Sequence, residues 1–199
     1  MARNSDYDFA GKYTKEGAVG RWLVDRFYAA LAELLQECSG PRHLEVGCGE
    51  GFSTQRVNAS LPPDSRLFAL DVEPRLVRAA AERNPGVRLC LGSAYDLPLR
   101  DGSFDTVLAL EVLEHLETPD RALRELTRVA RRWVVLSVPR EPIWRLLNLT
   151  RLRYVGALGN TPGHLQHWSR RGFLAFVSRA GRVRAVRSPL PWTQVLLEC

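Results

Sequence analysis

Apolar side chains recur every fourth residue near the start of the chain, at Val19, Leu23, Phe27, Leu31 and Leu35. Positions spaced in this way share one face of a helix, so the pattern predicts an amphipathic helix over 15–37. Five short and mostly apolar segments are typical of strands buried on both faces. These segments are 42–47, 66–72, 87–94, 104–111 and 132–139.

Helical patterns separate and follow these strands, at 53–61, 75–83, 119–131 and 169–180. Ser53 and Ser169 stand where they would cap two of the helices. Two further strand-like segments, 182–188 and 193–199, are close enough to pair with each other. The alternation predicts an α/β, doubly wound (Rossmann-like) fold. We expect a mostly parallel seven-stranded sheet with an antiparallel C-terminal strand and helices on both faces.

The composition is that of an ordinary globular protein of one domain, with 199 residues, 45% hydrophobic and 25% charged. No apolar run approaches the ~18–20 residues that a membrane span requires, and residues 1–17 lack the apolar stretch of a signal peptide. The four cysteines show neither CxxC nor metal-ligand spacing. We therefore expect reduced thiols, a cytoplasmic protein and no bound metal.

Positive charge is concentrated in the last third of the chain. Residues 140–199 carry ten arginines and two glutamates, a net charge of +8, whereas the whole chain carries +6. Such asymmetry is typical of a surface for an anionic partner such as nucleic acid. The whole chain is biased towards arginine, and arginines spread along helices are usually solvated surface, which is the interpretation we favour.

The segment HLEVGCGEG, from His43 to Gly51, ends the first predicted strand with glycine at every second position. Glycines weaken a strand and let a ligand approach the backbone. The second strand ends near Asp71, where a carboxylate reaches both hydroxyls of a ribose. In a parallel sheet these strand ends lie on one edge, so the two features predict a nucleoside site.

The glycine spacing distinguishes between two kinds of nucleoside cofactor. Dinucleotide-binding folds use G-x-G-x-x-G around a pyrophosphate, whereas this chain has acid-x-G-x-G-x-G. Glu50 stands where a pyrophosphate would lie and would repel it. The pattern favours a cationic cofactor that carries an amino acid, with a nicotinamide-dependent dehydrogenase as the alternative.

These segments, together with GSAYDLPLRDGSFDTVLALEVLEHL (92–116) and GHLQHWS (163–169), resemble class I S-adenosylmethionine (SAM) dependent methyltransferases. They are most similar to the ubiquinone- and menaquinone-biosynthesis-type branch. The resemblance implies a single methyltransferase domain over 1–199, SAM as cofactor and S-adenosylhomocysteine as product. Residues 141–168, which are irregular and match no α/β repeat, would be an inserted lid over the acceptor pocket.

The resemblance also implies which residues bind SAM: Glu45, Gly47, Cys48, Gly49, Gly51, Asp71, Val72, Ser93, Ala94, Leu110 and Glu111. Among them Glu45 orients the methionine end, Asp71 binds the ribose and Val72 packs on the adenine. Ser93 stands where the family commonly has an aspartate that holds the adenine amino group. Either Ser93 or Asp96 would then make the contact with the adenine amino group.

A hydroxyl acceptor needs a base, and a histidine with a pKa near neutral suits that role. The catalytic candidates are His115, which follows the fourth strand, and His164 and His167, which lie in the predicted lid. The structural alternative is that these histidines start or cap helices. Tyr7 and Tyr13 belong to a segment that folds over SAM in similar enzymes.

We therefore expect methyl transfer to a small molecule by in-line displacement, with oxygen as the favoured acceptor atom. The alternatives are an RNA methyltransferase that uses the basic C-terminal third and, from another class, a dehydrogenase or a non-catalytic SAM-binding protein. No aromatic-basic motif of the known modules supports RNA. Trp144, Tyr154 and Trp168 would line the acceptor pocket or form the core of the lid itself. The acceptor and the oligomeric state stay open.

Overall fold

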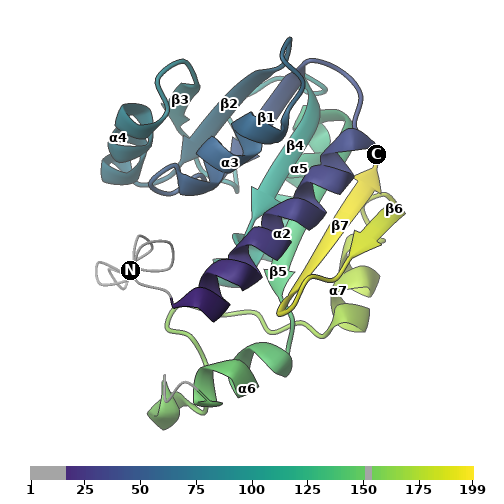
Figure 1. Ribbon diagram of the computed structural model, residues 1–199. Helices are drawn as coiled ribbons and strands as arrows, with labels where there is room; N and C mark the ends of the chain where they lie inside the picture. Colours follow the sequence, from purple (N-terminus) through teal and green to yellow (C-terminus); the bar gives the residue numbers. More distant parts are fainter. Residues whose placement is uncertain (1–16, 151–153) are drawn as a thin grey trace.

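The computed structural model describes residues 17–150 and 154–199 and shows one seven-stranded sheet with helices on both faces (Figure 1). The strands are β1 (Arg42–Val46), β2 (Arg66–Asp71), β3 (Arg88–Leu91), β4 (Phe104–Leu110), β5 (Ala130–Pro139), β6 (Arg182–Arg187) and β7 (Trp192–Glu198). They lie in the order β3-β2-β1-β4-β5-β7-β6. Strand β7 is antiparallel to both of its neighbours, and the pairs among β1–β5 are parallel. The predicted fold class is confirmed.

The helices are α2 (Ala18–Gln36), α3 (Phe52–Ser60), α4 (Pro74–Arg83), α5 (Pro119–Val129), α6 (Ile143–Thr150) and α7 (Arg170–Val177), with 3-10 turns η1 (Leu113–His115) and η2 (Val155–Ala157). Figure 1 shows α2 and α3 in front of the sheet and α5 and α7 behind it. Helix α6 and the loop after it lie beyond the carboxyl ends of β4 and β5. Tyr7 and Tyr13 lie outside the described residues.

Alternate residues of the central strands face two separate apolar cores. In β4, Val107 and Ala109 join the core formed with α5 and α7, whereas Leu108 and Leu110 join the core formed with α2. All four side chains are buried. Because successive side chains of a strand point to opposite faces, a strand covered on both faces is apolar throughout. This explains why a mostly apolar segment marked each central strand in the sequence.

Two local predictions about helices were wrong. Residues 141–168 are not wholly irregular, since they contain α6, whose buried residue is the polar Asn148. Helix α6 has only eight residues, fewer than the window of about 11–18 residues over which a helical period is recognised. Ser53 does not cap α3, because that helix begins after Gly51, whose φ is 81°. The predicted cap at Ser169 is confirmed, and its side chain accepts a hydrogen bond from the backbone N–H of Gly172.

The excess charge of the C-terminal third is partly balanced in space by carboxylates from earlier in the chain. Arg179 lies 2.8 Å from Asp120, and Arg187 lies 2.7 Å from Glu33. These pairs favour the interpretation of the arginines as ordinary surface. Within residues 17–150 and 154–199, no helix is long and apolar enough to cross a bilayer.

The connection between β3 and β4 has no helix, and Arg128 of α5 holds it in place. The Arg128 guanidinium donates hydrogen bonds to the backbone oxygens of Leu97 and Leu99 and pairs with the carboxylate of Glu125 at 2.7 Å. Glu125 also accepts a hydrogen bond from the backbone N–H of Leu97. These contacts, with the hydrogen bonds from Arg128 as the main cause, lower the pKa of Glu125 to about 2.

Replacing Glu125 by glutamine should lower the free energy of unfolding by about 1–2 kcal/mol at pH 7, because charge-assisted hydrogen bonds are lost. The folded pKa of about 2 lies below the ordinary value of 4.5. This stabilisation is therefore fully present above pH 4.5 and is lost as the pH falls through 2. Urea unfolding at pH 7 and pH 3 measures it. Glu82→Gln on exposed α4 is the control, and equal stability of the two variants at pH 7 would contradict the assignment.

Candidate active site

The residues predicted to bind SAM from the first two strands lie at one edge of the sheet, where β1 and β2 end side by side. The backbone N–H groups of Gly47 and Cys48 donate to the carbonyl oxygen of Leu70. The next turn residue, Gly49, donates its N–H to a carboxylate oxygen of Asp71 at 2.9 Å. The glycine turn after β1 is thereby fastened to the end of β2, as the sequence predicted for a nucleoside site.

The three glycines of the turn all have positive φ, but their surroundings differ. A Cβ atom on Gly47 would lie 2.5 Å from a methyl group of Val112, and one on Gly51 would lie 2.9 Å from the backbone of Ala80. A Cβ atom on Gly49 would meet nothing within 4 Å. Gly47 and Gly51 are therefore required for packing, whereas Gly49 presents bare backbone to open space that a ligand can use.

Asp71 and Val72 have the properties that a nucleoside site requires. One carboxylate oxygen of Asp71 accepts from Gly49, and the other accepts from the N–H of Glu73 at 3.0 Å. Each oxygen keeps a second lone pair for a ribose hydroxyl. Val72 is 71% exposed although it follows a buried strand. Its apolar side chain is available to pack against an adenine ring, so both residues fit the cofactor.

Glu45 lies behind the glycine turn and is almost completely enclosed, at 1% exposure. Burial raises the pKa of its carboxyl, and the hydroxyls of Ser53 and Thr54 partly offset this rise. Neither hydroxyl makes a hydrogen bond of good geometry with it. A buried carboxylate with its hydrogen-bonding capacity left over fits a positively charged group at the turn. Its contact with SAM stays a prediction.

Ser93 and Ala94 lie in a tight turn after β3. Ser93 forms an isolated β-bridge with Asp96, and its hydroxyl oxygen accepts a hydrogen bond from the N–H of Tyr95. Ala94 and Tyr95 pack against the apolar core on the α5 side. The Ser93 side chain therefore stabilises its own turn, and the adenine contact of Ser93 or Asp96 stays a prediction.

At the end of β4, Leu110 is buried and Glu111 has a φ of 58°, in the left-handed region. The Glu111 carboxylate accepts hydrogen bonds from the indole N–H of Trp192 at 2.7 Å and from the hydroxyl of Ser137 at 3.0 Å. The backbone N–H of Glu111 donates to the carbonyl oxygen of Ser137 at 3.2 Å. These contacts commit the carboxylate and the N–H to β5 and β7, and the contact of Leu110 and Glu111 with SAM stays a prediction.

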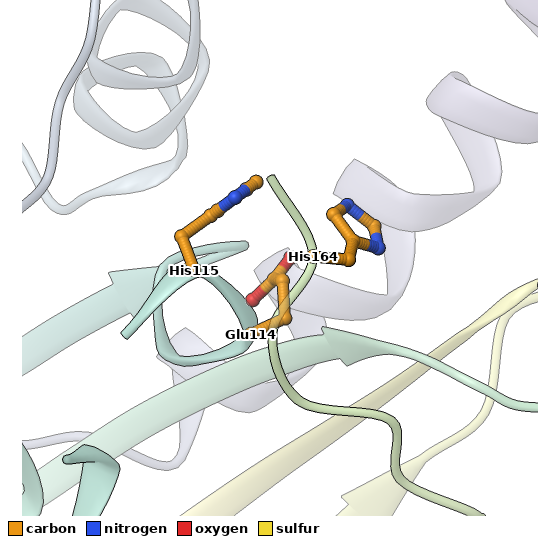
Figure 2. Close-up of side chains that lie close together, drawn as sticks. All are labelled: Glu114, His115 and His164. Carbon is orange, nitrogen blue, oxygen red and sulfur yellow. The ribbon is translucent and has the colours of Figure 1, made fainter. Parts of the chain in front are cut away.

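Two of the three candidate catalytic histidines come together, and the third does not. The rings of His115 and His164 lie edge to face with centroids 5.0 Å apart. Figure 2 shows the carboxylate of Glu114 beside the two rings, with Glu114 and His115 on η1 and His164 on the loop that follows η2. His167 lies instead beside Glu141, at 3.8 Å, and desolvation, with a smaller effect of Arg145, lowers its pKa. The sequence analysis missed Glu114, although it stands next to His115 in EVLEHL.

The aromatic residues of the predicted lid are largely packed within the protein. The ring of Trp144 stacks on His164, and its indole N–H donates to the hydroxyl of Thr161 at 2.9 Å. Trp168 packs against Phe173 and Phe176 of α7. Of the two interpretations left open by the sequence, these contacts favour a structural core for both tryptophans. The role of 141–168 as a lid stays a prediction.

Comparison with known proteins gives the same assignment. Residues 44–136 match the family described as "Methyltransferase domain". The chain is 31% identical over 106 residues to a "Probable S-adenosylmethionine-dependent methyltransferase" of Mycobacterium tuberculosis, over 53% of this chain and 38% of that protein. It is 34% identical over 97 residues to the ajmaline N-methyltransferase of Rauvolfia serpentina, over 45% of this chain and 33% of that enzyme.

A SAM-dependent methyltransferase of Aquifex aeolicus has the same fold, with a TM-score of 0.70 at 20% identity, over 96% of this chain and 98% of that one. The Aquifex structure confirms the predicted fold. The match of residues 44–136 and the Mycobacterium relative confirm the predictions of a SAM-dependent methyltransferase and of SAM as its cofactor, whereas the extent of the domain over 1–199 stays a prediction. The chain spans little more than a third of the length of the curated relatives, 36% of a Streptomyces fradiae protein and 38% of the Mycobacterium protein. The activity of the whole protein is therefore a proposal.

The different surroundings of the glycines predict different effects of two alanine substitutions, mainly on stability for Gly51 and mainly on ligand binding for Gly49. Gly51→Ala should lower the free energy of unfolding by about 2–4 kcal/mol, because a strained backbone adds to a close contact. Gly49→Ala should cost about 1–2 kcal/mol for its backbone alone and should weaken S-adenosylhomocysteine binding at least tenfold. Urea unfolding and calorimetry measure the two effects. Unchanged affinity of Gly49→Ala would contradict the role of its open space.

Proposed function

We propose that this chain transfers the methyl group of SAM to an oxygen atom of a small molecule, at the edge where β1, β2 and β4 end. The observation that carries the proposal is the nucleoside subsite, in which Gly49 presents bare backbone beside the Asp71 carboxylate and the exposed side chain of Val72. SAM supplies a methyl group on a positively charged sulfur. The methyl group passes to a nucleophile held in line with it.

The chain's own residues supply alignment and a polar acceptor side. Asp71 would hold the ribose, Val72 would cover the adenine, and the backbone at Glu111 would face the methionine part. The turn η1 follows β4 and begins directly after Val112, whose side chain lies against Gly47. Glu114 and His115 on η1, with His164 beside them, would therefore lie on the acceptor side of the glycine turn. Oxygen acceptors need loss of a proton, and polar groups at this place support them over acceptors that need none.

The acceptor class and the family branch are part of the same proposal. Similarity of residues 92–116 and 163–169 to the ubiquinone- and menaquinone-biosynthesis-type enzymes supports a small-molecule acceptor. The name of the Rauvolfia relative supports a nitrogen acceptor instead, which an assay would distinguish. The paired arginines of the C-terminal third argue against an RNA surface. The four cysteines are free, which supports the cytoplasm as the compartment.

Asp71→Ala should weaken the binding of S-adenosylhomocysteine by about 10–100-fold, because charge-assisted hydrogen bonds to the ribose are lost. Glu73→Gln, an exposed neighbour, is the matched control and should bind as the unaltered chain does. Isothermal calorimetry measures both variants, and circular dichroism confirms that they are folded. Affinity no better than millimolar for the unaltered chain, or an unchanged Asp71→Ala, would refute the cofactor site. A rise in melting temperature with NADH alone would support a dehydrogenase.

Labelled SAM and an extract of the source organism test the acceptor. We expect label from the methyl group in a low-molecular-weight product, joined to oxygen, and no label in the RNA fraction. Label in RNA would support the alternative substrate. Label joined to nitrogen would contradict oxygen as the acceptor atom and would support nitrogen, as in the name of the Rauvolfia enzyme. Binding of S-adenosylhomocysteine without transfer to any acceptor would indicate a non-catalytic SAM-binding protein.

A further inference from the structure

We propose that Glu114, His115 and His164 form a binding site for one divalent transition-metal ion. Each residue offers one ligand atom, a carboxylate oxygen or an imidazole nitrogen, and these atoms lie within 4.8 Å of one another. Atoms bound to one ion at about 2.1 Å lie roughly 3–4 Å apart, so small side-chain rotations bring the three groups onto an ion. Figure 2 shows the carboxylate beside the two rings.

The hydrogen bonds of His115 prepare its ring to act as a ligand. Its Nδ1 atom lies 3.0 Å from the backbone oxygen of Gly163. A carbonyl oxygen only accepts, so this contact places the ring proton on Nδ1 and leaves the lone pair on Nε2. Histidines that bind metals commonly have such a carbonyl partner, which fixes both the tautomer and the orientation of the ring.

The loop that carries His164 is fastened to η1 by backbone hydrogen bonds. The N–H groups of Leu165 and Gln166 both donate to the carbonyl oxygen of Glu114, at 2.7 and 3.0 Å, and the Gln166 side chain donates to the oxygen of Leu116. Trp144 stacks on the His164 ring with the two planes 29° apart. Ligands from two distant parts of the chain are therefore positioned before any ion binds.

Burial supports a cation at this place. Glu114 is 1% exposed and His164 is 7% exposed, whereas His115 is half-buried. A carboxylate held away from water is stabilised by a positive ion beside it. The half-buried His115 lies at the outer side of the cluster, so an ion and its remaining ligands can reach the site. This proposal departs from the expectation of no bound metal, which rested on cysteine spacing.

The ligand set indicates the kind of ion. Two imidazoles and one carboxylate suit Mn²⁺, Fe²⁺, Co²⁺, Ni²⁺ or Zn²⁺ better than Mg²⁺ or Ca²⁺, which prefer oxygen ligands. Three protein ligands leave positions open for an exogenous group. On the proposed function, which this step rests on, an acceptor hydroxyl takes an open position and loses its proton to water. Its oxygen then bonds to the methyl carbon as the methyl–sulfur bond breaks, and the sulfur keeps the electron pair.

Metal binding is tested on the full chain after treatment with a chelator, in the absence of SAM. Calorimetry with Zn²⁺ and visible absorption with Co²⁺ should both show one ion for each chain, with micromolar or tighter affinity. His164→Ala and Glu114→Gln should each weaken binding at least tenfold. His167→Ala is the matched control, because His167 lies in the same segment but outside the cluster, and it should bind the ion as the unaltered chain does.

Three results would overturn the site: no ion bound, several ions bound weakly, or equal binding by all the variants. If Glu114→Gln fails to fold, His115→Ala decides, because its ring is half-buried and its loss is better tolerated. Binding of S-adenosylhomocysteine is measured in each variant by the same method. A variant that loses metal binding but still binds S-adenosylhomocysteine supports the metal site and says nothing about the proposed function. An unaltered chain that binds the metal but not S-adenosylhomocysteine refutes the proposed function and leaves the metal site supported.

Discussion

The hydrogen bond from the backbone N–H of Gly49 to the carboxylate of Asp71 joins the ends of β1 and β2, and the candidate site depends on it. It holds the glycine turn open beside the second strand and orients the carboxylate at the same time. The bond is possible because the two strands are parallel neighbours that end at the same edge of the sheet. Asp71 therefore stabilises the glycine turn even without a cofactor, and the same side chain would couple the local fold to nucleoside binding.

The acceptor side of the same sheet edge is formed by the segment that follows β5. The segment after β5 crosses beyond the strand ends, forms α6, and returns so that its loop bonds to the backbone of η1. Trp144 and Thr161 form part of its interior through one hydrogen bond at 2.9 Å. Among the described residues of this segment the buried side chains are Asn148, Thr161 and His164, so polar contacts and stacking stabilise its conformation. Its position brings His164 to Glu114 and His115, and the proposed metal site follows from that return.

The succession of strands and helices along the chain, and the sheet edge at which the glycine turn and Asp71 meet, were predictable from local pattern. Apolar runs with glycine, proline or a capping residue at their ends are short-range signals, and each needs only its own few residues. The predicted turn at Gly47–Gly51 and the carboxylate of Asp71 lie where the parallel strands β1 and β2 end, and the ribose contact of Asp71 stays a prediction. The helix at Ile143–Thr150 was missed because its eight residues are too few to establish a helical period. The cap at Ser53 was wrong because Gly51 turns the chain two residues earlier.

The sequence by itself determined the α/β fold and the cofactor class, and it located the glycine turn and Asp71 at one edge of the sheet, because these depend on period and spacing within short segments. Only the tertiary structure decided which glycine is open to a ligand, that His167 is separate from His115 and His164, and that Glu114 joins the latter two. It also decided that arginines of the last third pair with carboxylates of earlier helices. The physical reason is that these contacts join residues far apart in sequence, and a local sequence pattern contains no information about how close such residues lie in space.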